Sequence, residues 1–143
     1  MTGYISLDYL AGFIDGEGYF TICKAGKQSK TFMFRLGINN TDLEIIQLIQ
    51  KEYGGRIYED KRAFRSGRRR CWMLIWSGNS AIEMSQLLKD KLIIKKQQAE
   101  IFSQIHINEI GKCHNIGYEE NDFRKNSMTT IQNLNQRGRK EVN

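Results

Sequence analysis

Hydrophobic residues recur every three or four positions in five segments of the chain, a spacing that places them on one face of a helix. The first helix is predicted over residues 6–17, with Ser6 as its N-cap. Two capping boxes open further helices: Thr41-Asp42-Leu43-Glu44 opens one that ends before Gly54-Gly55, and Ser80-Ala81-Ile82-Glu83 opens one that reaches about Leu88. A long helix is predicted over about residues 91–110 and a short one around residues 122–135.

Alternating hydrophobic and polar residues predict four strands, over residues 19–25, 31–38, about 56–64 and 70–77. Gly26–Lys30 forms the turn of the first pair, and Ser66-Gly67 lies in the turn of the second. Hairpins separated by helices predict an α+β fold, in which helices cover one face of an antiparallel sheet and leave the other face free.

The alternation also predicts which side chains face the helices. In residues 31–38 the inward set is Phe32, Phe34, Leu36 and Ile38, and the outward set is Thr31, Met33, Arg35 and Gly37. In the other strands the predicted inward residues are Phe20, Ile22, Ile57, Trp72, Leu74 and Trp76. The predicted outward residues there are Tyr19, Thr21, Cys23, Arg56, Tyr58, Asp60, Cys71, Met73 and Ile75. A slip of one residue in register would exchange the two faces.

The positive charge lies on the predicted strands. The chain has 143 residues, enough for one domain over residues 1–143, with about 112–143 as a polar C-terminal extension. Its formal net charge is +6. Residues 19–40 and 55–77 hold eleven basic and two acidic residues, a net charge of +9, which leaves −3 on the rest. This distribution favours a nucleic-acid surface, and a solvated basic face without a ligand is the alternative.

Several other classes of protein are disfavoured. Cys23, Cys71 and Cys113 form no C-x-x-C pair, so a zinc ribbon or finger is excluded, and the thiols are typical of a reduced, intracellular protein. His106 and His114 lack the spacing of zinc ligands. The sequence predicts neither a membrane-spanning segment nor a signal peptide. We therefore expect an intracellular location, in a prokaryotic cytoplasm or an organelle matrix.

The segment from Leu10 to Gly18 carries the most informative chemistry. Gly12 and Gly16 lie one turn apart on the predicted helix, and a bare stripe of this kind allows close approach of a second helix. Asp15 and Glu17 lie at the C-terminal end of the helix, where the helix dipole disfavours carboxylates. A cation such as Mg²⁺ would stabilise them, and solvated acids at a frayed helix end are the alternative.

Leu10-Ala11-Gly12-Phe13-Ile14-Asp15-Gly16-Glu17-Gly18 resembles the motif of the LAGLIDADG homing endonucleases. Phe13 stands in place of leucine, Gly16 of alanine and Glu17 of the second aspartate. The predicted order of elements is similar to the αββαββα fold of this family, and Leu134–Gly138 resembles a segment found near the family's C-terminus.

The resemblance implies a site-specific endonuclease that makes a staggered double-strand break in a long, pseudo-palindromic DNA target, as in intron homing. One motif per chain implies a homodimer, with an interface made by the first helix through Leu10, Ala11, Gly12, Phe13 and Gly16. Other members of the family bind intron RNA as maturases, and related folds act as non-catalytic regulators of transcription. A regulator would be expected to lack the acid at position 17, which this chain retains as Glu17.

The family pattern also assigns site residues. Glu17 corresponds to the metal ligand, assisted by the carbonyl group of Gly16, and Mg²⁺ is the expected cofactor, with Mn²⁺ as a substitute. Asp15 corresponds to a mostly structural position. The polar residue that orders water is assigned to Asn40, with its neighbour Asn39 left open. The active-site lysine is assigned to Lys95, with Lys96 as the alternative.

Double-stranded DNA is the expected partner of the free sheet face, because a β-ribbon fits the major groove. The residues predicted to contact DNA are Tyr19, Thr21, Cys23, Lys24, Lys27, Lys30, Thr31, Met33, Arg35, Arg56, Tyr58, Asp60, Lys61, Arg62, Arg65, Arg68, Arg69, Arg70, Cys71 and Met73.

Overall fold

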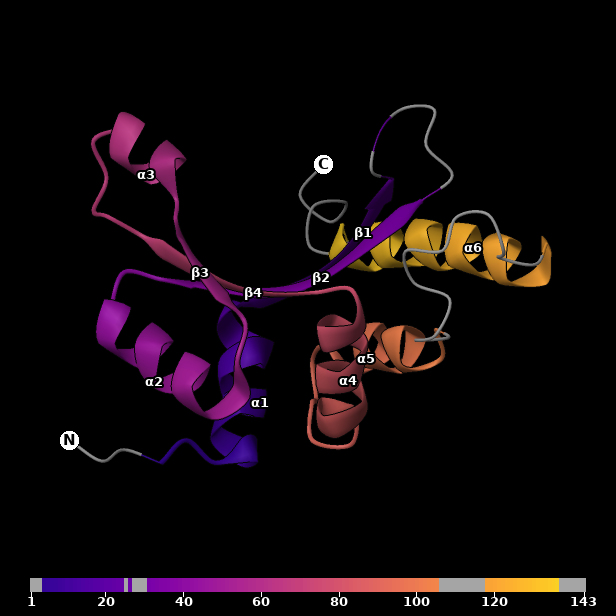
Figure 1. Cartoon of the computed structure of the whole chain (residues 1–143), viewed down its shortest axis with the longest axis horizontal. Coiled ribbons are helices and arrows are strands. Elements are labelled where there is room, and N and C mark those ends of the chain that lie inside the picture. Colours follow the sequence, from indigo (N-terminus) through magenta and orange to yellow (C-terminus); the bar gives the residue numbers. More distant parts are fainter. Residues whose placement is uncertain (1–3, 25, 27–30, 106–117, 137–143) are drawn as a thin grey trace.

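The computed structural model describes residues 4–24, 26, 31–105 and 118–136 (Figure 1). Its elements, in chain order, are α1 (Leu7–Glu17), β1 (Gly18–Lys24), β2 (Phe32–Asn40), α2 (Leu43–Tyr53), β3 (Arg56–Glu59), α3 (Lys61–Arg65), β4 (Trp72–Ser77), α4 (Asn79–Leu88), α5 (Lys96–Ser103) and α6 (Tyr118–Asn135). Among the described residues, no helix combines the length and the apolar character that a membrane crossing requires.

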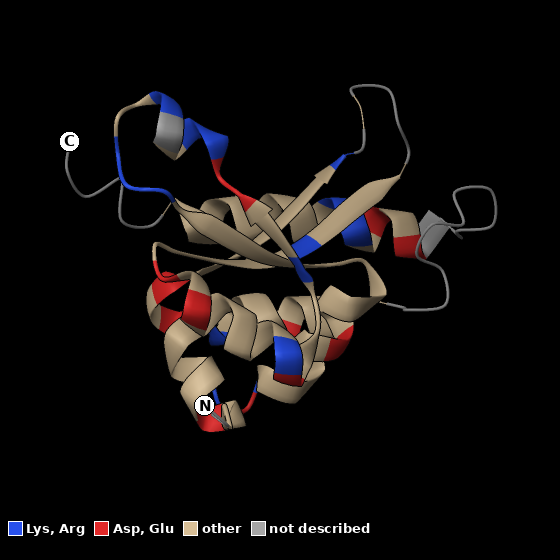
Figure 2. Ribbon diagram, turned by 60° about the vertical axis from the view of Figure 1, so that its left-hand side comes forward, with Lys and Arg blue, Asp and Glu red and all other residues tan. Residues whose placement is uncertain are grey.

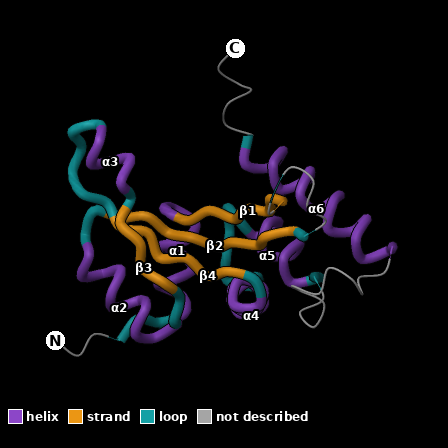
Figure 3. The backbone as a smooth tube through the Cα atoms, turned by 45° about the horizontal axis from the view of Figure 1, so that its top comes forward, coloured by secondary structure: helices purple, strands orange, loops and turns teal. Residues whose placement is uncertain are grey.

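The strands form one antiparallel sheet in the order β1-β2-β4-β3. The helices α1, α2, α4 and α5 lie on one face of the sheet, and α6 lies beside β1 at its edge (Figures 1 and 3). The predicted α+β fold with helices on one face is confirmed.

The predicted inward residues form the core. Phe32, Phe34, Leu36 and Ile38 of β2 are almost completely buried, while Arg35 between them is exposed. Their neighbours in the core include Phe20, Ile22, Leu74 and Trp76. Phe102 of α5 meets the rings of both Phe20 and Phe34 edge-on, with ring centroids 5.1 and 6.0 Å apart. The register read from the sequence is therefore correct, since a slip would have placed Arg35 in the core.

The first helix begins and ends as predicted. The Ser6 hydroxyl accepts a hydrogen bond from the Tyr9 amide at 3.1 Å, and Gly18 ends the helix by donating its amide to the Ile14 carbonyl. The Tyr53 hydroxyl donates to the Ile5 carbonyl at 2.7 Å and ties α2 to the segment that precedes α1.

Both predicted capping boxes are wrong about the capping residue. The N-cap of α2 is Asp42 rather than Thr41, because the Asp42 carboxylate accepts the amides of Glu44 and Ile45. The helix α4 begins at Asn79, behind Gly78, and has no side-chain cap. Gly78 has a φ of 59° and donates its amide to the Phe34 carbonyl, so the chain leaves β4 in a turn that places Ser80 inside the helix.

Two element boundaries also differ from the prediction. The strand predicted over residues 56–64 ends at Glu59, because the Asp60 carboxylate accepts the Arg62 amide at 3.0 Å and starts the short helix α3. The helix predicted over residues 91–110 is confined to Lys96–Ser103 within the described residues. Residues 93–95 instead form a loop whose amides bind Asp15.

The polar segment near the C-terminus contains a longer helix than predicted, and this helix packs on the sheet. Arg124 of α6 is 1% exposed, lies with its guanidinium 5.5 Å from the centre of the Phe34 ring, and pairs with Glu120 at 3.0 Å. The Asn135 side chain donates to the Phe20 carbonyl at 2.9 Å. The helix thus covers the free edge of β1, which removes an unpaired strand edge from solvent.

Candidate nucleic-acid interface and catalytic site

The uncovered face of the sheet carries cross-strand rows of partly exposed side chains. One row runs from Tyr19 through Gly37 and Ile75 to Arg56, as the strand pairing requires. The Tyr19 ring lies over Gly37, where an added side chain would come within 2.3 Å of the Tyr19 hydroxyl. Burial raises the pKa of Tyr19 above its ordinary value. This face therefore offers a flat, mixed polar and apolar surface of the kind that reads the edges of base pairs.

Basic residues gather on the same side of the sheet. Figure 2 shows them over α3, the segment after it and the neighbouring strands, on the side opposite α2 and α4. Arg65, Arg68 and Arg69 are exposed and form no ion pair among the described residues. Lys24, Arg35, Arg56 and Lys61 are also exposed, whereas Lys27 and Lys30 lie outside the described residues.

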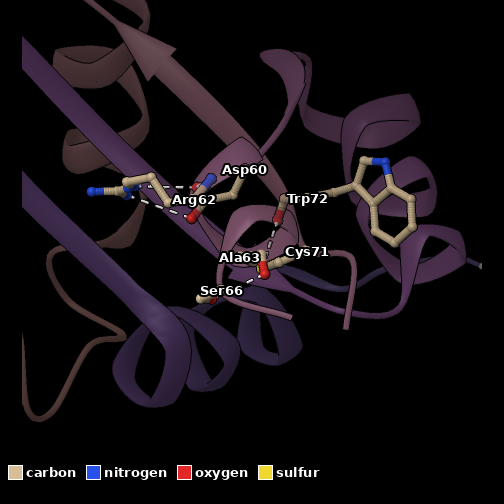
Figure 4. Close-up of polar contacts among 6 residues, drawn as sticks. All are labelled: Asp60, Arg62, Ala63, Ser66, Cys71 and Trp72. Atoms are coloured by element: carbon tan, nitrogen blue, oxygen red, sulfur yellow. Dashed lines mark hydrogen bonds and ion pairs between the residues drawn. The ribbon is translucent and has the colours of Figure 1, made fainter. Parts of the chain in front are cut away.

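Two of the arginines predicted to contact DNA also support the fold of their own hairpin. Arg62 bonds to the Asp60 carboxylate at 3.2 Å (Figure 4). Arg70 forms two hydrogen bonds to the Glu59 carboxylate, at 2.8 and 3.1 Å, and lies 5.3 Å from the centre of the Trp72 ring. These contacts with Arg70 and Arg62 lower the pKa of Glu59 and Asp60, respectively. Asp60, predicted to face DNA, is therefore engaged in starting α3.

The carboxylate of Glu17 lies at the junction of α1 and β1. Glu17 is exposed at the last position of α1, and the next residue, Gly18, pairs with Ile38 of β2. Glu17 and Asn39 each lie one residue away from this pair along the chain. The negative charge of Glu17 acts on two neighbours: it adds to burial and Asp60 in raising the pKa of the Cys71 thiol, and it opposes the effect of burial on Lys95.

Lys95 is held against the end of α1 by a network that the sequence did not reveal. Its ammonium group donates to the Asp15 carbonyl at 2.7 Å. The Asp15 carboxylate accepts the amides of Ile93, Ile94 and Lys95 at 2.8, 3.1 and 3.0 Å. Burial lowers the pKa of Lys95, against the charges of Asp15 and Glu17. Asp15 is therefore stabilised by three backbone amides, in agreement with the structural role that the resemblance implies.

The structure distinguishes Asn40 from Asn39, the two asparagines between which the sequence did not decide. The Asn40 side chain accepts the Asp42 amide at 2.8 Å and supports the start of α2. Asn39 occupies an alternate position of β2 that faces the same side as the outward residues Met33 and Arg35. Its side-chain oxygen is buried and has no hydrogen-bond partner among the described residues. These positions favour Asn39 over Asn40 for the predicted water-ordering role, which stays a prediction. Lys96 is exposed as the first residue of α5, so Lys95 is favoured as the predicted active-site lysine.

One face of α1 has no cover among the residues that the structure describes. A side chain added at Gly12 or Gly16 would meet no atom within 4 Å. Tyr9 beside them is 51% exposed, and Ile93 and Ile94 are 85% and 72% exposed. Phe13 is half-buried. In contrast, Leu10 and Ala11 are 0% and 2% exposed and pack in the core, so their predicted place in the interface is corrected.

The described residues hold a single candidate side-chain metal ligand at the junction of α1 and β1, Glu17. No group of three or more His, Cys, Asp or Glu side chains that could hold a metal ion occurs within the described residues. Glu17 and the last carbonyl groups of α1 are hard oxygen donors at an exposed helix end, which suits Mg²⁺. They form only part of a coordination shell, so further ligands would have to come from outside the described residues.

The fold and site together define a class of protein: an α+β domain with a cationic sheet face and a first helix that ends in a carboxylate beside a lysine. The family profile described as LAGLIDADG endonuclease matches residues 10–68. The match includes the segment Leu10–Gly18 and confirms the resemblance to this family that was read from it. None of the curated proteins matches the sequence.

Solved structures of homing endonucleases share the fold. I-CvuI, in complex with its target in the presence of calcium, superposes with a TM-score of 0.65 at 17% identity, covering 90% of this chain and 80% of that one. I-GzeII, in complex with a DNA target, gives a TM-score of 0.64 at 21% identity, covering 90% and 44%. The archaeal intron-encoded I-Vdi141I, complexed with DNA, gives 0.56 at 20% identity, covering 90% and 96%. The chain thus spans less than half the length of I-GzeII. At these identities the comparison confirms the fold.

Proposed function

We propose that this protein is a homing endonuclease that, as a homodimer, makes a staggered double-strand break in a long pseudo-palindromic DNA target. The observation that carries the proposal is the junction of α1 and β1. There an exposed carboxylate, Glu17, ends a helix with an uncovered face, next to Lys95 and at the margin of a cationic sheet. The DNA complexes of the structurally similar enzymes support the choice of substrate.

In this proposal the two subunits bring their α1 helices together, so that two Glu17 side chains meet near the two-fold axis. Glu17 and the Gly16 carbonyl hold divalent cations, with Mg²⁺ expected and Mn²⁺ as a substitute; bound there, the cations would activate water and neutralise charge on the phosphate. Lys95 contributes a cation beside the same site, and Asn39 orients water. The outward residues of the sheet read base edges, and the exposed arginines bind phosphates.

The test is cleavage of a randomised duplex library by the purified protein in Mg²⁺, followed by sequencing of the cut ends. We expect one recurrent cut site with inverted-repeat symmetry, because a symmetric dimer reads two equivalent half-sites. Removal of the metal with EDTA should stop cleavage and leave binding in place. Binding without any cleavage in Mg²⁺ or Mn²⁺ would reject the nuclease and favour the regulator. Preference for intron RNA over every duplex would favour the maturase.

The proposed interface predicts that Gly12→Leu converts the dimer to a monomer. A Cβ added at Gly12 has no described atom within 4 Å apart from its own helix backbone and chain neighbours, so the substitution should leave the fold intact. A helix-forming residue in place of glycine adds about 1 kcal/mol to helix stability. On the partner's helix it should clash. Sedimentation equilibrium measures the mass, and Gln47→Leu, an exposed position on α2, is the matched control. A Gly12→Leu protein that still dimerises would place the interface elsewhere.

A further inference from the structure

A cavity of about 460 Å³ lies where α5, α6 and the junction of α1 and β1 meet. Gly18 and Tyr19 line it from β1, Lys95 and Gln98 from α5 and the residue before it, and Asn135 from the end of α6. Figure 3 shows α5 and the β1 edge of the sheet next to α6. The cavity therefore opens beside Glu17, which directly precedes Gly18.

Gln98 is the unexplained residue in this cavity. It is 7% exposed, and its side chain forms no hydrogen bond with any described residue. Its amide atoms are not among the buried polar atoms that lack a partner, so the carboxamide reaches the open space of the cavity. Its neighbour Gln97 has the same side chain but is exposed. A carboxamide held in the wall of a cavity without a bond to a described residue is able to donate to a group that enters the cavity.

The lining of the cavity favours an anionic partner. Its described lining contains the Lys95 ammonium group and the carboxamides of Gln98 and Asn135, and no Asp or Glu side chain. The Asn135 amide is already directed to the Phe20 carbonyl, so it supports the wall rather than the ligand. Lys95 is fixed by its bond to the Asp15 carbonyl. The Gln98 amide is thus the donor in this cavity that has no partner within the described residues.

We propose that Gln98 is a substrate-binding residue: its carboxamide donates to a backbone phosphate of the bound DNA, in the cavity beside Lys95. The inference rests on the proposed function, because it places the DNA backbone over the junction of α1 and β1. The connection is geometric, since Tyr19 belongs both to the cavity and to the outward face of the sheet. A duplex on that face passes the mouth of the cavity with its phosphates directed to it.

The proposal is tested with duplexes that each carry one uncharged methylphosphonate, moved through the central phosphates of the target recovered from the library. Binding is measured in Ca²⁺ for the wild type, Gln98→Met and the control Gln97→Met. In the wild type, one methylphosphonate position per half-site should weaken binding about tenfold. In Gln98→Met that position should lose its effect, and binding of unmodified DNA should weaken about tenfold. Gln97→Met should keep the wild-type profile.

Thermal unfolding separates this role from a structural one. Gln98→Met should unfold at the same or a higher temperature than the wild type, because it breaks no hydrogen bond within the described residues and places an apolar side chain of similar size in the wall. A lower unfolding temperature with an unchanged methylphosphonate profile would overturn the proposal and make Gln98 a packing residue. If the library yields no cut site, the nuclease proposal fails by itself. The same scan is then made on a duplex selected by binding, where the profile still decides the role of Gln98.

Discussion

Glu17→Gln is expected to lower the rate of DNA cleavage by at least about 10³-fold and to change DNA binding by less than about twofold. The substitution keeps the size of the side chain and removes its charge, so it weakens the coordination of divalent cations at the end of α1. Glu17 lies at the margin of the sheet face that is proposed to bind DNA, and its loss removes no positive charge from that face. Single-turnover cleavage in Mg²⁺ measures the rate, and binding in Ca²⁺ measures the affinity.

The matched control is Glu83→Gln, which neutralises an exposed acid on α4. It should cleave as fast as the wild type, because α4 lies on the opposite face of the sheet. Cleavage by Glu17→Gln at the wild-type rate would reject the proposed mechanism, although the match to the family profile and the shared fold would stand. Loss of both cleavage and binding would show that Glu17 supports the structure of the interface rather than the chemistry.

Arg124→Met is expected to lower the free energy of unfolding by about 3–5 kcal/mol. Arg124 is 1% exposed, and its partner Glu120 has a side chain that is 10% exposed, so removing the arginine leaves a nearly buried carboxylate without this counter-ion. The guanidinium also lies against the Phe34 ring in the core of the sheet. Urea denaturation followed by circular dichroism gives the free energy. Lys125→Met, at the exposed neighbouring position, should change it by less than about 0.5 kcal/mol.

A double-mutant cycle isolates the ion pair from the packing of the arginine. The variant Glu120→Leu/Arg124→Met removes both charges, and most of the lost stability should return, because two apolar side chains replace a desolvated pair. If the two substitutions destabilise additively, the effect of Arg124 comes from its contact with Phe34 instead. Either result would describe how α6 is held on β1, the contact that turns the polar C-terminal segment into part of the domain.

The periodicity of the sequence was sufficient to predict the strands of the sheet, their inward faces and the first helix. A strand exposes alternate residues to opposite faces, so Phe32, Phe34, Leu36 and Ile38 had one possible orientation once a core was required. The motif in α1 indicated the resemblance to the family. Glycines such as Gly12, Gly16 and Gly18 lower the stability of a helix, so they are expected only where close packing or a turn requires them. Glu17 was therefore visible as a candidate before any contact was known.

Local sequence was a poor guide wherever a residue takes its partner from elsewhere in the chain. Nothing in the sequence around Asp15 indicates that its carboxylate binds amides some eighty residues later. This contact keeps residues 93–95 out of the helix that was predicted to begin at residue 91. The difference between Asn39 and Asn40 likewise depends on which face each occupies at the end of β2.

The sequence by itself thus determined the two faces of the sheet, the sign of the charge on the free face and the helix that carries Glu17, because these depend on spacing along one segment. Only the tertiary structure decided the neighbours of Lys95, the burial of Gln98 and the docking of α6. Those depend on which distant segments meet when the apolar surface is buried, and hydrogen bonds between such segments leave no periodic trace in the sequence.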